Sequence, residues 1–415
     1  MFTAPPAFRH RDFRLFWSGL ACSAIGGQFS TVAMAWQVYQ LTGSPFQIGL
    51  LGLSRAIPQM ALSLVGGLFA DAIDRRKLLA VSQITQGSTA VVLVWLSVTD
   101  AITPTALFIA TGLSAIFTAL ETPARQAILP NLVPREDLTS AMALNVSQRN
   151  LGTIVGPSVA GVVIAFSGAT WCYALDGLSR LILLGAIAAI KIPHSVSRQQ
   201  SGLGLGALRD GLTFVWLNPI LLTFMLLDFG ATLFGSARAL IPIYAEEILL
   251  VGPVGMGMLY AAESIGAILA GVLMSTLALP RRAGVGVIAG VAIYGAATIV
   301  FAFSTWFWLS IVMLACAGVG NTVSTVLRGT INQLTTPDDL RGRVTGINSV
   351  FTTGGPALGQ FESGVVAAIW TTEISALSGG VATLVLAATV AAFPFVRNFE
   401  LVRGSNPSPG PRAPA

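Results

Sequence analysis

The sequence predicts an all-α membrane protein with twelve transmembrane helices in two pseudo-symmetric bundles of six. Three observations carry this prediction. Apolar residues make up 54% of the 415-residue chain, whereas charged residues make up 10%. The mean hydropathy is +0.76, and a soluble domain would carry about 25% charged residues. A segment in the first half of the chain also recurs in the second half, at a fixed spacing of 203 residues.

Each predicted span holds about 20 apolar residues, enough to cross a ~30 Å hydrocarbon layer. Spans must be helical, because lipid offers no partner for an open strand edge. The twelve runs are 13–40, 46–70, 78–98, 104–128, 138–166, 169–191, 215–245, 254–279, 283–303, 306–332, 340–368 and 371–397.

The internal repeat relates residues 145–163 to residues 348–366. Its identities are Asn145, Gly152, Gly156, Gly161, Val162 and Val163 with Asn348, Gly355, Gly359, Gly364, Val365 and Val366, and further Arg125 with Arg328 and Pro134 with Pro337. A doubling at about 200 residues in an apolar chain is typical of two-halved secondary transporters.

Lysine and arginine positions set the topology. With a cytoplasmic N-terminus, 19 of the 23 basic residues, Arg328 among them, fall at cytoplasmic ends and loops. The other four fall inside spans: Arg55, Arg149, Arg180 and Arg238. Both termini are therefore predicted to be cytoplasmic. The predicted units are an N-terminal segment (1–12), a six-helix bundle (13–191), a cytoplasmic linker with an amphipathic segment (192–214), a second bundle (215–397) and a disordered tail (398–415).

Composition excludes several classes of function. His10 and His194 fall in polar segments, and the three cysteines lie in apolar runs without CxxC spacing. No GxxxxGK[ST] phosphate loop is present in the sequence, which disfavours an ATP-driven pump. We expect neither an enzyme nor a metal, cofactor or nucleic-acid partner.

The segment GLFADAIDRRK at 67–77 resembles the cytoplasmic signature of the major facilitator superfamily. Ala72 and Asp74 depart from it, standing where a basic residue and a glycine are usual. The resemblance implies a cytoplasmic gate formed by Gly67, Asp71, Asp74, Arg75 and Arg76. Glu121 and Arg125 either belong to this gate or only anchor their helix near its cytoplasmic end.

The segment GTIVGPSVAG at 152–161 resembles the fifth-helix motif of the antiporter branch of that superfamily. Gly152, Gly156 and Gly161 permit close packing of helices, and Pro157 bends the span. This resemblance implies a proton-coupled exporter; the alternative is a tightly packed interface without coupling specificity. Residues 122–145 and 211–219 are similar to the bacterial enterobactin-exporter subgroup. This resemblance implies a location in a bacterial inner membrane.

An ionisable group at mid-span costs several kcal/mol unless it is paired or faces water. Asp176 and Arg180 lie four residues apart, as do Glu121 and Arg125, so each pair can close within one helix. We predict a structural role for Asp176–Arg180, because the sixth helix is peripheral in the superfamily.

Four further charges lack a partner on their own helix. Glu263 and Arg149 lie about 14 and 16 Å into the eighth and fifth spans. The resemblance to the superfamily implies that these two spans lie side by side, which predicts an ion pair between the two residues. Arg55 faces the eleventh span, which carries Glu362. Asp228 has no obvious partner.

Burial without a counterion favours the neutral form of a carboxyl group, which suits a site that takes up and releases protons. The coupling candidates are therefore Asp228, Glu263, Arg149, Arg55 and Glu362; the alternative is that the two carboxylates brace helices. The candidates for the substrate cavity are Gln28, Trp36, Phe117, Phe229, Phe234, Tyr260, Asn321 and Phe351.

Together these features predict a monomeric exporter of amphiphilic or drug-like small molecules in exchange for protons. Alternating access of two rocking halves would carry the substrate, and the proton gradient alone would supply the energy. Its expected partners are the substrate, protons and the lipid bilayer. A siderophore exporter, a lysophospholipid flippase and a membrane sensor or receptor on the same fold are the alternatives.

Overall fold

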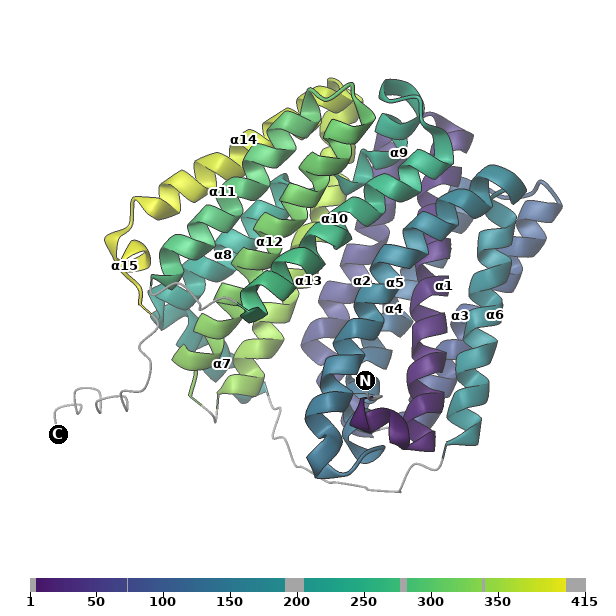
Figure 1. The fold of residues 1–415 in the computed structure, drawn as a ribbon, viewed down its shortest axis with the longest axis horizontal. Helices are drawn as coiled ribbons and strands as arrows, with labels where there is room; N and C mark the ends of the chain where they lie inside the picture. Colours follow the sequence, from purple (N-terminus) through teal and green to yellow (C-terminus); the bar gives the residue numbers. More distant parts are fainter. Residues whose placement is uncertain (1–4, 73, 191–204, 277–281, 338–339, 401–415) are drawn as a thin grey trace.

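The computed structural model describes residues 5–72, 74–190, 205–276, 282–337 and 340–400, with the side chains of all but 63–72 and 205–208. Every regular element in these ranges is a helix, and the two halves of the chain form two bundles side by side (Figure 1). The predicted all-α class is confirmed.

The first bundle contains six long helices. These are α1 (Arg11–Thr42), α2 (Pro45–Ala72), α3 (Arg75–Val98), α4 (Pro104–Ile128), α5 (Leu138–Ser167) and α6 (Ala169–Ala189). Three 3₁₀ turns accompany them: η1 (Pro6–Arg9), η2 (Leu129–Asn131) and η3 (Arg135–Asp137). The bounds follow the predicted spans to within a few residues.

The second bundle is less regular. Its elements are α7 (Leu205–Leu217), α8 (Pro219–Phe234), η4 (Ala237–Ala239), α9 (Ile241–Ile243), the π-helix η5 (Tyr244–Ile248), α10 (Gly252–Thr276), α11 (Ala283–Ala302), α12 (Phe307–Thr335), α13 (Arg341–Ile369), α14 (Thr372–Ala391) and α15 (Pro394–Arg397).

Nine helical segments of the described residues are long and apolar enough to cross a membrane. The long helices α1, α2 and α13 are outside that group. Two of the three, α2 and α13, pack against each other at the seam between the halves, and α1 lines the cavity described below. Polar and small side chains on such helices pack against neighbouring helices or line the cavity, and they lower the mean hydropathy of the helix.

The seventh predicted span, 215–245, is not one continuous helix. Asn218 caps the start of α8, where its Oδ1 accepts a hydrogen bond from the Leu221 amide. The helix ends at Phe234, and three short turns follow up to Ile248. Pro242 supplies no amide donor within these turns. The apolar residues continue through the break, so hydropathy alone could not reveal it.

The glycines of the repeat make equivalent contacts in both halves. A Cβ on Gly156 would lie 2.5 Å from the Gln28 side chain of α1, and a Cβ on Gly359 would lie 2.4 Å from the Thr232 carbonyl of α8. Gly161 and Gly364 instead face the opposite half. The repeat in the sequence is therefore a structural pseudo-symmetry.

The two halves meet along two helix pairs. Gly161 of α5 packs against Gly257 of α10, and Gly364 of α13 packs against Gly49 of α2, each at a distance that leaves no room for a side chain. Such contacts allow backbones to approach closely, as is common between helices in membranes.

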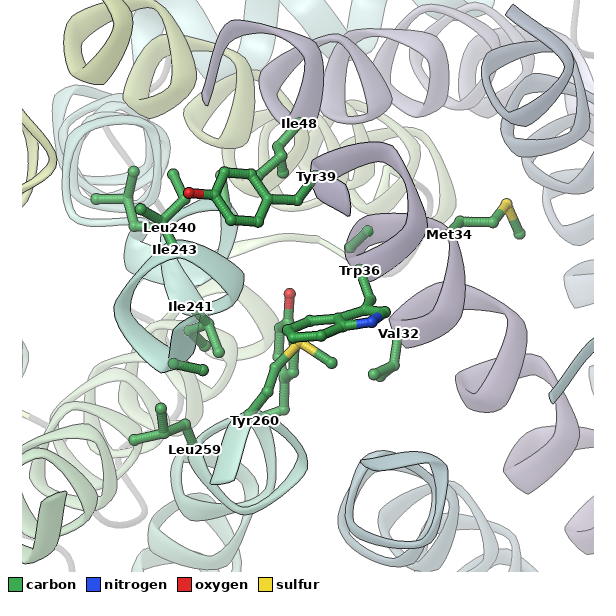
Figure 2. Packing of buried hydrophobic residues seen from close by; sticks show 14 of the residues in the cluster. Val32, Met34, Trp36, Tyr39, Ile48, Leu240, Ile241, Ile243, Leu259 and Tyr260 are labelled. Atoms are coloured by element: carbon green, nitrogen blue, oxygen red, sulfur yellow. The ribbon is translucent and has the colours of Figure 1, made fainter. Parts of the chain in front are cut away.

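One apolar cluster joins the halves near the C-terminal end of α1. Trp36 and Tyr39 of α1 face the short helix α9 and the start of α10 (Figure 2). Leu240 and Ile241 are almost completely buried there. In the predicted topology this cluster lies at the outer end of the molecule.

Candidate functional site

A cavity of about 350 Å³ lies within the first bundle, and a smaller one of about 120 Å³ adjoins it. Both are lined by Gln28, Thr31 and Arg55, so they are parts of one space. The second half contributes Arg238, Tyr260 and Gln360 to the smaller part. The combined space therefore extends from the first bundle to the interface between the halves, and it is large enough to hold a small ligand.

The cavity ends beside the apolar cluster of Figure 2. Its lining on α1 extends as far as Ala35, and the next turn, from Trp36 to Tyr39, is buried in that cluster. In the other direction the lining reaches Arg149, which is exposed. The space is therefore closed toward the predicted outer end by side chains of both halves.

Polar contacts add to this closure. The Tyr39 hydroxyl donates a hydrogen bond to the Glu247 carboxylate, and the Gln40 side-chain amide donates to Glu246 at 3.4 Å. Tyr39 and Gln40 belong to α1, whereas both glutamates belong to the π-helix η5. The contacts thus tie one half to the other at the C-terminal end of α1.

A network of polar side chains lines the cavity on the side of the first bundle. Arg180 Nε lies 2.9 Å from Asp176 Oδ1, and the Ser30 hydroxyl donates to Asp176 Oδ2 at 2.6 Å. Arg180 also donates to the Ser23 hydroxyl at 3.2 Å. The predicted Asp176–Arg180 pair is present, but it lines the cavity and is not peripheral.

Glu121 extends this network through α3. It accepts hydrogen bonds from Gln83 Nε2 at 2.8 Å and Gln86 Nε2 at 3.3 Å. Its other oxygen lies 4.0 Å from Arg125 Nη1, so the predicted Glu121–Arg125 pair is present as a long contact. Two neutral amides are thus the nearest donors to this buried carboxylate.

The predicted Arg149–Glu263 pair is wrong. Glu263 Oε2 instead lies 3.6 Å from Arg238 Nε, and Arg238 also stacks over the Tyr260 ring at 5.7 Å. Arg149 lies twelve residues before Gly161, whereas Glu263 lies six residues after its antiparallel contact Gly257. The two charges are therefore offset by about 9 Å along the helices.

The expectation that Asp228 has no partner is also wrong. Asp228 Oδ1 lies 2.5 Å from Arg328 Nη1, and each side chain is only 9% exposed. Arg328 was counted with the cytoplasmic loops, but α12 continues to Thr335 and holds it two turns inside the helix. Arg328 also donates to the Ser324 carbonyl and the Thr325 hydroxyl.

Arg55 lines the cavity on α2, and α13 is its neighbour as predicted. The α13 side chain that shares the cavity is Gln360, and not Glu362. Residues two positions apart in a helix point about 200° apart around its axis, so Gln360 and Glu362 face different sides of α13. Glu362 is half-buried and lines neither part of the cavity.

The aromatic and amide candidates divide into two groups. Gln28 and Tyr260 line the cavity, and Trp36 lies in the apolar cluster that closes it, beside Tyr260 (Figure 2). Phe229 and Phe351 pack edge to face 5.9 Å apart. The side chains that do not line either part of the cavity are Phe117, Phe229, Phe234, Asn321 and Phe351.

The predicted gate is described only in part, because the surroundings of Gly67 and the side chain of Asp71 lie outside the described part of the chain. Asp74 caps α3, where it accepts hydrogen bonds from the amides of Arg76 and Lys77. Arg76 Nη2 donates to the Ala188 carbonyl of α6 at 2.9 Å. Arg75 is half-exposed at the first turn of α3.

The antiporter-like motif combines packing within one half and between halves. Gly152 and Gly156 contact α1, whereas Gly161 contacts α10. A Cβ on Gly257 would lie 2.5 Å from the Pro157 carbonyl. The motif therefore packs α5 both against the cavity-lining helix α1 and against α10 of the other half.

Sequence reasoning missed three functional candidates. Arg238 was recognised as an embedded charge but was given no partner, because the break after Phe234 was not visible. Arg328 could have been found from the repeat: it matches Arg125, but Ser324 stands where Glu121 would supply the acid. Nothing in the sequence marks Gln360 as a cavity residue except its polar side chain within a predicted span.

Comparisons with known proteins agree with this geometry. A family model described as "Transmembrane secretion effector" matches residues 3–413. The enterobactin exporter EntS of Shigella boydii serotype 18 is 27% identical over 382 residues, covering 92% of this chain and 90% of that protein. The enterobactin exporter of Escherichia coli O1:K1 is 26% identical over the same coverage.

Two solved structures show the same fold. The nucleoside transporter NupG has a TM-score of 0.72 at 16% identity, covering 92% of this chain and 98% of that one. A bacterial homologue of the human lysosomal transporter Spinster, in an inward-facing and unoccupied conformation, has a TM-score of 0.72 at 14% identity, covering 95% and 98% of the two chains.

Proposed function

From the premise that this chain belongs to the transmembrane secretion effector family of major facilitator transporters, we propose that it exports amphiphilic small molecules in exchange for protons. It is a multi-pass membrane transporter and not an enzyme. The bacterial inner membrane, the monomeric state and the proton gradient as the energy source belong to the proposal.

The observation that carries the proposal is a cavity between two pseudo-symmetric halves, closed at one end and lined by embedded charges. In an alternating-access transporter the two halves rock about such a site. In the predicted topology the closed end is the outer one, so the cavity accepts its substrate from the cytoplasm.

Proton coupling in this proposal depends on two ion pairs of the second half. Glu263 makes a moderate contact of 3.6 Å with Arg238, which lines the cavity, and the Glu263 side chain is 19% exposed. Asp228 is more tightly held by Arg328. Protonation of either carboxylate neutralises it and releases its arginine. The charge then changes between α10 and η4 for Glu263, or between α8 and α12 for Asp228.

Transport into proteoliposomes tests the proposal. With an acidic lumen, protons leaving the vesicle would drive substrate in, and collapse of the pH gradient by nigericin should stop accumulation. Enterobactin is the first substrate to use, because the relatives are named as its exporters. Accumulation of no compound from an amphiphile panel, with or without a gradient, would contradict transport.

A siderophore exporter is the second candidate function. The names of the relatives favour it, and their matches cover 92% of this chain. Enterobactin uptake that outcompetes unrelated amphiphiles in the same vesicles would select this narrower function over a broad one.

A further inference from the structure

We propose that the central cavity binds amphiphiles bearing a permanent negative charge, held beside Arg55. The inference deepens the proposed export function and rests on it for its physiological meaning. It concerns the charge of the substrate, on which the proposed function makes no statement.

The charges of the cavity do not balance. Among the described residues, each cavity-region carboxylate has its own arginine: Asp176 with Arg180, Glu121 with Arg125, and Glu263 with Arg238. The cavity is lined by two further arginines, Arg55 and Arg149. Neither has a carboxylate within ion-pair distance in the described part of the chain, which leaves the space with a net positive charge.

Arg55 is the stronger of the two for binding. It lies between the halves, at the junction of the larger and smaller parts of the cavity. Arg238 approaches from the other half and carries the same charge, so the two guanidinium groups repel each other. A cation at this depth is costly unless an anion or water compensates it, and a ligand anion between the two arginines would supply that compensation.

The remaining lining suits an acidic group on an apolar body. The side-chain amides of Gln28 and Gln360 offer neutral hydrogen-bond donors in the part of the cavity that Arg55 lines. Met34, Leu51 and Pro157 supply apolar surface in the same part of the cavity. Arginine donates several hydrogen bonds in a fixed plane, which matches carboxylate, sulfonate or phosphate oxygens.

Arg149 fits a role at the entrance. It is exposed and lies on the side of the larger cavity away from the apolar cluster. A positive group at the mouth of a low-dielectric cavity raises the local concentration of anions. Outward movement of an anion and inward movement of a proton are, moreover, both favoured by a negative-inside membrane potential.

Equilibrium binding to the full chain in nanodiscs of zwitterionic lipid tests this inference. Three probes share one fluorophore: dansyltaurine is a permanent anion, dansylpropylamide is neutral, and dansylaminoethyltrimethylammonium is a permanent cation. Fluorescence anisotropy should show at least tenfold tighter binding of dansyltaurine. Equal affinities, a preference for the cation, or no saturable binding of dansyltaurine would overturn the inference.

Variants separate the site from general effects of charge. Arg55→Gln should abolish the preference for dansyltaurine, and Arg55→Lys should retain part of it. Arg282→Gln is the matched control, because Arg282 is exposed and pairs with exposed Glu400 away from the cavity. A preference that survives Arg55→Gln would also overturn the inference; Arg149→Gln, expected to weaken it less, provides a second variant should Arg55→Gln not fold.

Competition with lysophosphatidate and with salicylate distinguishes an acyl lipid from a compact aromatic acid as the source of the anion. Displacement of dansyltaurine by either supports an anion site, and displacement by neither contradicts it. Because binding requires no flux, charge-selective binding without transport would refute the proposed function alone. Transport restricted to cations would refute the inference alone.

Discussion

Asp228 of α8 and Arg328 of α12 form an ion pair with a separation of 2.5 Å, in which each side chain is 9% exposed. Removing one partner of such a pair leaves a buried charge without compensation, which typically costs about 3–5 kcal/mol. We therefore expect Asp228→Asn to lower the unfolding temperature strongly, as measured by intrinsic fluorescence in detergent.

The double variant Asp228→Asn with Arg328→Gln should recover much of that stability, because it removes both charges. It also separates the two roles of Asp228. If the recovered protein accumulates substrate under a pH gradient, Asp228 is a brace and does not carry the proton. If it catalyses counterflow but not gradient-driven accumulation, Asp228 carries the proton.

Glu263 offers the second coupling test. Glu263→Gln keeps the size of the side chain but cannot exchange a proton, and it leaves Arg238 without its 3.6 Å partner. We expect gradient-driven accumulation to fall at least tenfold while counterflow persists. Glu400→Gln is the control, because Glu400 is exposed beside Arg282. Unchanged accumulation in Glu263→Gln would exclude Glu263 as the carrier.

The contact between Tyr39 and Glu247 should stabilise closure at the C-terminal end of α1. A hydrogen bond to a charged group contributes about 1.5–3 kcal/mol, so Tyr39→Phe should shift the population toward opening at this end by tenfold or more. Spin labels at exposed Leu41 and Leu250, in a background without native cysteines, would report longer distances.

Tyr173→Phe is the matched control for that shift. Tyr173 donates a hydrogen bond to Gln37 at 2.7 Å, but both residues belong to the first half. The control should leave the distance distribution unchanged. Equal distributions in Tyr39→Phe and the parent protein would show that the apolar cluster alone holds this end closed.

Close packing between the halves gives a further prediction. A Cβ on Gly257 would lie 2.5 Å from the Pro157 carbonyl, which is backbone and cannot move aside. Gly257→Ala should therefore lower the unfolding temperature and the transport rate together. Gly271→Ala on the same helix meets nothing within 4 Å and should be neutral or stabilising by up to about 1 kcal/mol.

Hydropathy and the repeat predicted most of the fold, because a bilayer constrains span length and an inherited duplication constrains the pairing of helices. They could not predict the break after Phe234, where apolar residues continue without helical geometry. The contacts of Gly161 and Gly364 follow the repeat, because a glycine at a given position of the sequence directly indicates that another backbone can approach there.

Ion pairs were harder to predict than helices. Glu121–Arg125 and Asp176–Arg180 could be predicted because spacing within one helix determines whether side chains meet. Glu263 was assigned the wrong arginine because depth along each helix does not determine the register between helices. Asp228 seemed isolated because its partner lies on a helix a hundred residues later.

The most direct test of exchange is proton movement in proteoliposomes that contain the pH dye pyranine. Dansyltaurine, which cannot cross the lipid uncharged, is added outside while valinomycin and potassium clamp the membrane potential. The account predicts that the lumen becomes alkaline as substrate enters, and that vesicles without protein show no change. Entry of dansyltaurine without any change in the lumenal pH would contradict proton exchange.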